Sequence, residues 1–165
     1  MKITWKTPKG KTVTEAVGAA ERPFVEAIGL EATVRFFEVF GGRYVYFTDM
    51  RMQDRNRIAQ EFGAETAKLI NSVMVGMKYG GGSYRVPLSN IFIARVMRSQ
   101  GRTIDDISNK LRATDSTVRR WLLPNAVQAE QARKLQTKRH KQAIAEAKAE
   151  MNAAAKPVTR AVVRT

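Results

Sequence analysis

A short run of hydrogen-bonding side chains in the C-terminal half carries the clearest chemistry of this sequence. Its members are three hydroxyls and two guanidiniums: Thr114, Ser116, Thr117, Arg119 and Arg120. A guanidinium can pair with guanine through two hydrogen bonds, and each such pair contributes roughly 1–3 kcal/mol of discrimination between bases. Thr117, Arg119 and Arg120 are therefore the expected base-edge or backbone contacts. Ser116 and Thr114 are expected to touch phosphate or to cap a helix.

These side chains share one face of a predicted helix over residues 115–122. The opposite face holds Val118, Trp121 and Leu122, which are expected to be buried. Thr114 precedes the helix, where its hydroxyl can accept a hydrogen bond from the first turn. A short, capped helix with a polar and basic face is what the major groove of DNA admits.

The first of two supporting helices is predicted over residues 90–99. Ile93, Val96 and Met97 recur at the spacing of one helix face. Gly101 ends the pattern, because glycine accepts the left-handed geometry of a helix end. Three arginines flank this segment: Arg95, Arg98 and Arg102. They are candidates for gripping the DNA backbone, and a solvated helix face is the alternative.

The second supporting helix follows Thr103, which is expected to cap it. Asp105 and Asp106 lie in the first turn, where the helix dipole favours negative charge. Its apolar face consists of Ile104, Ile107 and Leu111. Arg112 stands in the next turn where glycine is usual, which predicts a strained left-handed residue or a longer turn. The three helices predict a helix-turn-helix DNA-binding unit, with a helical hairpin that packs on another protein as the alternative.

The net charge of +14 is concentrated toward the C-terminus. Residues 119–165 hold eleven Lys and Arg against three Glu, whereas residues 1–88 contribute only +4. Such an excess indicates a polyanionic partner, most simply nucleic acid. Residues 126–156 are rich in helix formers and predict a solvated, partly formed basic helix, and residues 157–165 predict disorder. Five tail cations are expected to add salt-sensitive, sequence-blind affinity: Arg133, Lys134, Lys138, Arg139 and Lys141.

The N-terminal part of the chain divides into an arm and a repeated core. Residues 1–14 hold four Lys and are expected to form a loose arm, within a basic segment of residues 1–22. Residues 15–28 look helical, although Pro23 can split that helix. The sequence then contains an internal repeat, which we call the internal echo: the segment that begins at Phe62 resembles the segment that begins thirty-four residues earlier, at Ile28. Each copy, within residues 23–88, reads as helix, Gly, helix, Gly-Gly and a short aromatic strand.

The sequence offers no credible catalytic or metal site. It has no Cys and one His, His140, in a basic stretch, so no zinc site can be assembled. The glycines before Ser83 lack the Lys-Ser or Lys-Thr pair of a phosphate-binding P-loop. We expect no enzyme, no cofactor and no metal. A signal peptide and a membrane-spanning apolar run are also missing, so a cytoplasmic protein is expected.

Together these features resemble the Mor/C family of phage transcription activators. The matching features are the two Ile/Phe-Gly-x-Glu segments, the Gly-Gly-x-Tyr strand starts, Val86-Pro87 and the helix-turn-helix with residues 116–120. The resemblance covers about residues 23–122. It implies a homodimer with residues 23–88 as the dimerisation core and one helix-turn-helix, residues 89–123, from each subunit in the major groove.

The resemblance also implies that the strand-to-helix linker lies near DNA and that host RNA polymerase is recruited. Tyr84 and Arg85 in that linker would approach the minor groove or backbone. Three features depart from the family pattern, namely a longer second copy around residues 73–80, Arg112, and the basic tail of residues 124–165.

The predicted fold is therefore mainly α-helical with short β-strands, ending in a helix-turn-helix and a basic tail. The expected function is sequence-specific regulation of transcription on double-stranded DNA. The alternatives are an architectural DNA binder that uses the tail, a phage protein-interaction module acting on a host factor, and an RNA-binding protein.

Overall fold

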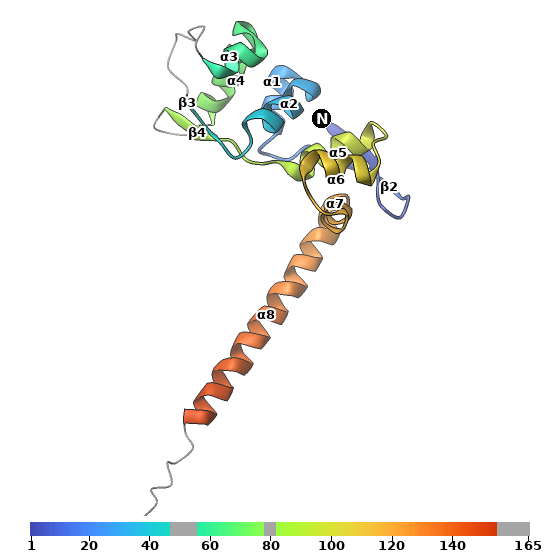
Figure 1. Ribbon diagram of the computed structural model, residues 1–165, viewed down its shortest axis with the longest axis vertical. Coiled ribbons are helices and arrows are strands. Elements are labelled where there is room, and N and C mark those ends of the chain that lie inside the picture. Colours follow the sequence, from blue (N-terminus) through green and yellow to red (C-terminus); the bar gives the residue numbers. More distant parts are fainter. Residues whose placement is uncertain (47–55, 78–81, 155–165) are drawn as a thin grey trace, which may run out of the picture. The chain divides into compact units, whose positions relative to one another are not determined.

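The computed structural model describes residues 1–46, 56–77 and 82–154 of the 165-residue chain (Figure 1). In these residues the fold is mainly helical, with eight helices and two small two-stranded antiparallel sheets. The chain divides into two units, residues 1–124 and residues 125–165, which are described separately. The predicted fold class is confirmed at this coarse level.

The N-terminus forms a β-hairpin, so the predicted loose arm is wrong. Strand β1 (Lys2–Lys6) pairs antiparallel with β2 (Thr12–Ala16). Ile3 and Trp5 point inward and are 7% and 2% exposed, because alternate residues of a strand face opposite sides. Strand β1 packs against helix α5 (Asn90–Ser99), and Ile3 and Trp5 belong to the same hydrophobic core as the buried side chains of that helix.

The helix predicted from residue 15 is also wrong in its first half. Residues to Ala16 belong to β2, and helix α1 (Arg22–Ile28) begins only one residue before Pro23. Proline fits the first turn of a helix, because the backbone N–H that it lacks has no helical acceptor there.

Both copies of the internal echo contain the predicted order of elements. Helices α1 and α2 (Leu30–Phe40) join at Gly29, and α3 (Arg57–Phe62) and α4 (Ala64–Gly76) join at Gly63. Both glycines have φ of 80°, a left-handed conformation that side chains disfavour. Strands β3 (Tyr44–Tyr46) and β4 (Ser83–Arg85) follow, although Gly81 of the second Gly-Gly lies outside the described residues.

The two copies share one core. Strand β3 pairs antiparallel with β4, with Val45 opposite Tyr84, and α1 packs against both α2 and α4. The ring of Phe24 lies 5.1 Å from that of Phe36 and 6.4 Å from that of Tyr84, centroid to centroid. Each copy therefore buries its apolar face on the other within a single chain.

The three helices predicted at residues 90–122 are present with nearly the predicted boundaries. They are α5 (Asn90–Ser99), α6 (Ile104–Leu111) and α7 (Asp115–Trp121). A capping box joins Thr103 to Asp106, and the hydroxyl of Thr114 accepts a hydrogen bond from the backbone of α7. Val118 and Leu122 are fully buried as expected, whereas Trp121 is only half-buried.

The second unit contains α8 (Asn125–Ala154), a helix of 30 residues whose described side chains are nearly all exposed. The basic helix is thus present where the composition predicts it. The segment predicted to be disordered, residues 157–165, lies outside the described residues. No helix in the described ranges is both long and apolar enough to cross a membrane.

Candidate nucleic-acid interface

The exposed face of α7 carries the predicted recognition residues. Ser116, Arg119 and Arg120 are exposed, and Thr117 is half-buried. In the described part of the chain, neither guanidinium has an ion-pair partner. Both arginines lie in the last turn of α7, where the helix dipole favours positive charge. They are therefore available to an external acceptor.

The three hydroxyls at the start of α7 bond to one another. The Oγ1 of Thr114 lies 2.9 Å from the Oγ1 of Thr117 and 3.0 Å from the Oγ of Ser116. Thr114 also accepts from the backbone N–H of Thr117, so it acts as the helix cap. Thr114 was expected either to contact phosphate or to cap the helix, and in the structure it caps the helix.

A side-chain bond that the sequence analysis missed fixes α7 against α6. The Oγ of Ser108, in a residue that is 7% exposed, donates to the Oδ1 of Asp115 at 2.9 Å. The turn between these helices passes through Arg112, which has φ of 50° and ψ of 45°. The predicted left-handed conformation of Arg112 is confirmed. The bond between Ser108 and Asp115 joins the two helices across this turn.

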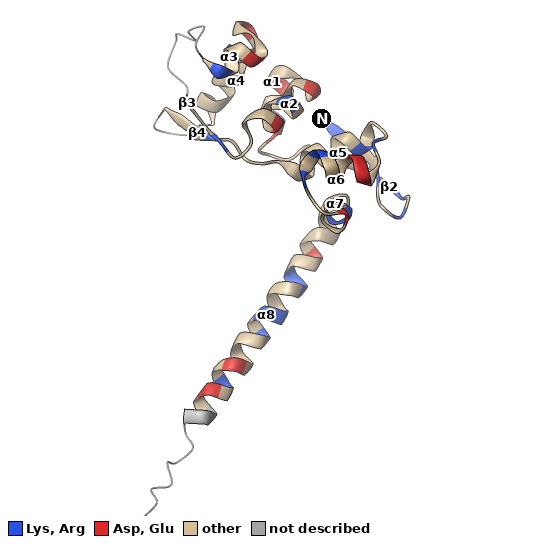
Figure 2. Ribbon diagram, in the orientation of Figure 1, with Lys and Arg blue, Asp and Glu red and all other residues tan. Residues whose placement is uncertain are grey.

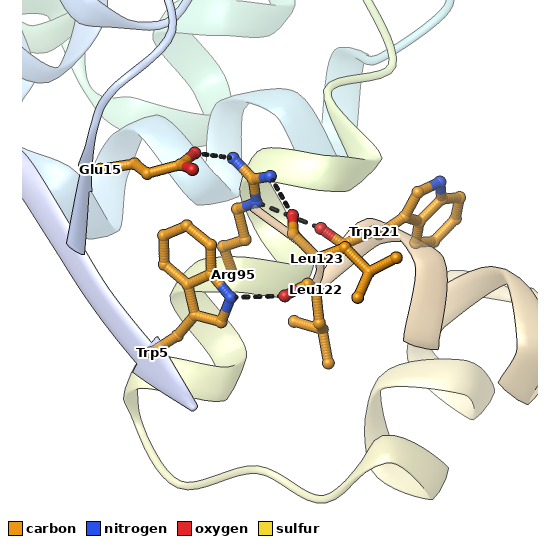
Figure 3. A network of polar contacts seen from close by, with 6 residues as sticks. All are labelled: Trp5, Glu15, Arg95, Trp121, Leu122 and Leu123. Atoms are coloured by element: carbon orange, nitrogen blue, oxygen red, sulfur yellow. Dashed lines mark hydrogen bonds and ion pairs between the residues drawn. The ribbon is translucent and has the colours of Figure 1, made fainter. Parts of the chain in front are cut away.

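Arg95 does not belong to the surface, which corrects its candidacy as a backbone contact. Its side chain is 9% exposed, and its Nη1 lies 3.2 Å from the Oε2 of Glu15 in the hairpin (Figure 3). Its Nε donates to the carbonyl of Trp121 at 3.1 Å, and its Nη2 donates to that of Leu123 at 2.8 Å. All of its polar edges point into the protein.

Trp5 completes this cluster from the hairpin. Its Nε1 donates to the carbonyl of Leu122 at 2.8 Å, and its ring centroid lies 4.5 Å from the Cζ of Arg95 (Figure 3). Burial lowers the pKa of Arg95, while the charge of Glu15 opposes that shift. Three consecutive carbonyls at the C-terminal end of α7 thus receive donors from elsewhere in the fold. We call Trp5, Glu15 and Arg95 the arginine clamp.

The other two arginines around α5 have different places. Arg98 is half-buried, and its guanidinium donates to the carbonyls of Lys6 at 3.3 Å and Arg102 at 2.8 Å. It therefore ties the hairpin to the connection between α5 and α6. Arg102 itself is exposed, so it remains a candidate for phosphate contact.

Tyr84 and Arg85, which were both expected to approach DNA, have different environments in the structure. Tyr84 is 5% exposed and packs in the core, which removes its ring as a candidate DNA contact. The reason is strand alternation, because Tyr84 lies opposite the buried Val45. Arg85 is exposed, and its Cζ lies 5.7 Å from the ring centroid of Tyr44. Tyr44 is 61% exposed, so the exposed tyrosine beside Arg85 is Tyr44 and not Tyr84.

Basic side chains run along α8 (Figure 2). Lys134 forms an ion pair with Glu130 at 2.6 Å, although both side chains are largely exposed. The other four predicted tail contacts are also exposed: Arg133, Lys138, Arg139 and Lys141. Exposed pairs of this kind are weak, so these cations can exchange partners at little cost.

The described residues contain no group of three His, Asp or Glu side chains that could hold a metal ion.

Comparisons with protein families, with curated proteins and with solved structures find no match.

Proposed function

We propose that this protein regulates transcription by binding double-stranded DNA in a sequence-specific manner. The observation that carries the proposal is the exposed face of α7, where Arg119 and Arg120 have no ion pair with any described residue and the helix is fixed at both ends. A preorganised helix loses little conformational entropy when it enters the major groove, so its contacts contribute fully to affinity. Ser116 and Thr117 lie on the same helix and add hydrogen-bonding groups.

The resemblance to the Mor/C family supports a more specific proposal. In it the protein is a phage or prophage activator that works in the cytoplasm of the host, binds as a homodimer and recruits host RNA polymerase. Exposed apolar side chains on the repeated core fit a need for protein partners, among them Tyr46 at 73% and Leu69 at 48% exposure. Arg85 and Arg102 would contact the DNA backbone beside the recognition helix.

The experiment that tests DNA recognition is selection from random-sequence duplexes at near-physiological salt. The wild type is compared with an Arg119→Ala/Arg120→Ala variant and with an Arg57→Ala/Lys68→Ala control, which removes the same charge from exposed sites on α3 and α4. We expect a two-fold-symmetric consensus from the wild type and the control, and none from the α7 variant. If the wild type enriches no sequence, the proposal is wrong.

A second candidate is an architectural DNA binder that uses α8 as its main contact. The exposed basic side chains of α8 favour it, because phosphate contacts alone supply sequence-independent binding. The test changes five cations to glutamine in the full-length chain: Arg133, Lys134, Lys138, Arg139 and Lys141. The architectural function predicts that binding is abolished, whereas the regulatory function predicts weaker binding with the same sequence preference.

A further inference from the structure

The N-terminal hairpin has an outer face made of two lysines, three threonines and one alanine. The exposed residues of its strands are Lys2, Thr4, Lys6, Thr12, Thr14 and Ala16. They form three cross-strand pairs, and in the central one the hydroxyls of Thr4 and Thr14 lie 2.8 Å apart. Ammonium and hydroxyl groups are the side-chain donors that contact phosphate oxygens. This face therefore has the chemistry of a phosphate-binding surface.

The turn of the hairpin extends that surface with two further exposed lysines, Lys9 and Lys11. The turn is closed by hydrogen bonds from the N–H of Gly10 to the carbonyl of Thr7 and from the N–H of Thr7 to the carbonyl of Lys11, both at 2.9 Å. The N–H of Lys11 also donates to the hydroxyl of Thr7 at 3.1 Å. The lysine backbones are thus held before any ligand arrives, which lowers the entropic cost of binding.

The outer face joins the helix-turn-helix at the connection between α5 and α6. The guanidinium of Arg98 bonds the carbonyls of both Lys6 and Arg102, so the hairpin and the connection lie together. A groove of about 440 Å³ runs between them, lined by Thr4, Trp5, Lys6, Thr12, Arg98, Ser99 and Gly101. In a helix-turn-helix, the helix before the recognition helix crosses the DNA backbone. Here that helix is α6, which begins two residues after Arg102.

The carboxylates near the hairpin do not lie on its outer face or in the groove. Glu15, the only acidic residue of the hairpin, lies on the inner side and is paired with Arg95. Asp106 is bonded to Thr103 and lines a separate hollow together with Glu38 of α2, and Arg102 also lines that hollow. The outer face and the groove therefore carry one sign of charge, which complements a phosphate backbone.

We propose that the outer face of the hairpin, with Arg102, binds the phosphate backbone of the same DNA that α7 reads. This inference rests on the proposed DNA-binding function and adds a second, sequence-blind contact from the opposite end of the chain. Each phosphate contact makes the decrease of log affinity with log salt steeper, by about 0.9 on B-DNA. Loss of hairpin lysines must therefore change the salt dependence and leave the base preference unchanged.

The test uses a Lys6→Gln/Lys11→Gln variant of the full-length protein, with Arg57→Gln/Lys68→Gln as a control of equal charge. Affinity is measured across a salt series on the duplex selected by the wild type and on a scrambled duplex of equal composition. We expect the hairpin variant to bind both duplexes more weakly, with a slope smaller by about 2 and an unchanged ratio of affinities. The control variant should keep the wild-type slope. Near-ultraviolet circular dichroism confirms that Trp5 stays packed.

Other outcomes overturn the proposal in distinguishable ways. If the wild type binds the selected duplex preferentially and the hairpin variant matches its slope, the hairpin proposal is wrong and DNA recognition stands. If both variants lose slope equally, the effect is one of net charge, and the hairpin is no specific contact. If the wild type binds neither duplex, the DNA-binding function fails together with the hairpin proposal.

Discussion

Two sets of arginines in the helix-turn-helix unit have opposite environments. Arg95 on α5 is 9% exposed and bonds only to protein atoms, whereas Arg119 and Arg120 on α7 are exposed and have no ion pair in the described part of the chain. Both sets look alike in the sequence, as basic residues on short helices. The difference comes from a hairpin whose Glu15 is 80 residues away from Arg95 in the chain. Long-range packing therefore decides which arginine stabilises the fold and which remains exposed to a binding partner.

The comparison implies that the two sets act on different free energies. Arg95 should change the free energy of unfolding, because its removal takes one donor from a carboxylate and from each of two carbonyls inside the fold. Arg119 and Arg120 should change only the free energy of DNA binding, because exposed substitutions away from special contacts alter stability by less than about 0.5 kcal/mol. The predictions that follow test this division, beginning with the largest effect.

Replacing Arg95 by methionine should destabilise the protein by about 3 kcal/mol, because the largely buried carboxylate of Glu15 loses the positive charge of Arg95. Urea denaturation followed by circular dichroism measures this change. The matched control is Arg119→Met, which should unfold at the wild-type urea concentration. Equal stability of the two variants would show that the arginine clamp does not hold the fold.

Replacing Trp5 by phenylalanine should cost roughly 1–2 kcal/mol, because the carbonyl of Leu122 loses its donor while the apolar ring is kept. Thermal unfolding measures the difference. Thr4→Val, on the outer face of the same strand, is the control and should have a much smaller effect. A larger loss for Thr4→Val would contradict the inward assignment of Trp5.

The sequence predicts helices α5, α6 and α7 well because their signals are local. Thr103 and Thr114 are caps within a few residues of the groups that they bond, and Gly101 ends a helix by its own conformation. The same holds for Gly29 and Gly63, whose shared φ explains the internal echo. Each of these residues needs only its chain neighbours to determine its role.

The parts that the sequence analysis missed depend on distant segments. Strand β1 is the exception, because the alternation of polar and apolar residues from Lys2 to Lys6 is itself a local strand signal. The burial of Arg95 needs Trp5, and the burial of Tyr84 needs β3 as its partner strand. No local pattern identifies such partners.

Arg112 adds a third case to the comparison of buried and exposed arginines, because its side chain is exposed but its backbone is strained. Left-handed geometry costs a residue with a side chain roughly 1–2 kcal/mol, so Arg112→Gly should raise the free energy of unfolding by about 1 kcal/mol. Arg112→Ala removes the charge and keeps the strain, so it serves as the control and should not stabilise. If alanine stabilises as much as glycine, the charge of Arg112 rather than its conformation is unfavourable.

Asp106 tests whether an exposed charge can still contribute to the fold. Hydrogen bonds from the backbone and then the side chain of Thr103 hold the pKa of this carboxyl below its ordinary value. A lowered folded-state pKa means that the stabilisation is complete above the unfolded pKa and is lost as pH falls through the folded one. The difference in melting temperature between the wild type and Asp106→Asn should therefore be constant above pH 5 and shrink below about pH 4. Asparagine can accept the same bonds but cannot titrate, so a difference that stays constant into acid would show that the carboxylate charge plays no part in the capping box.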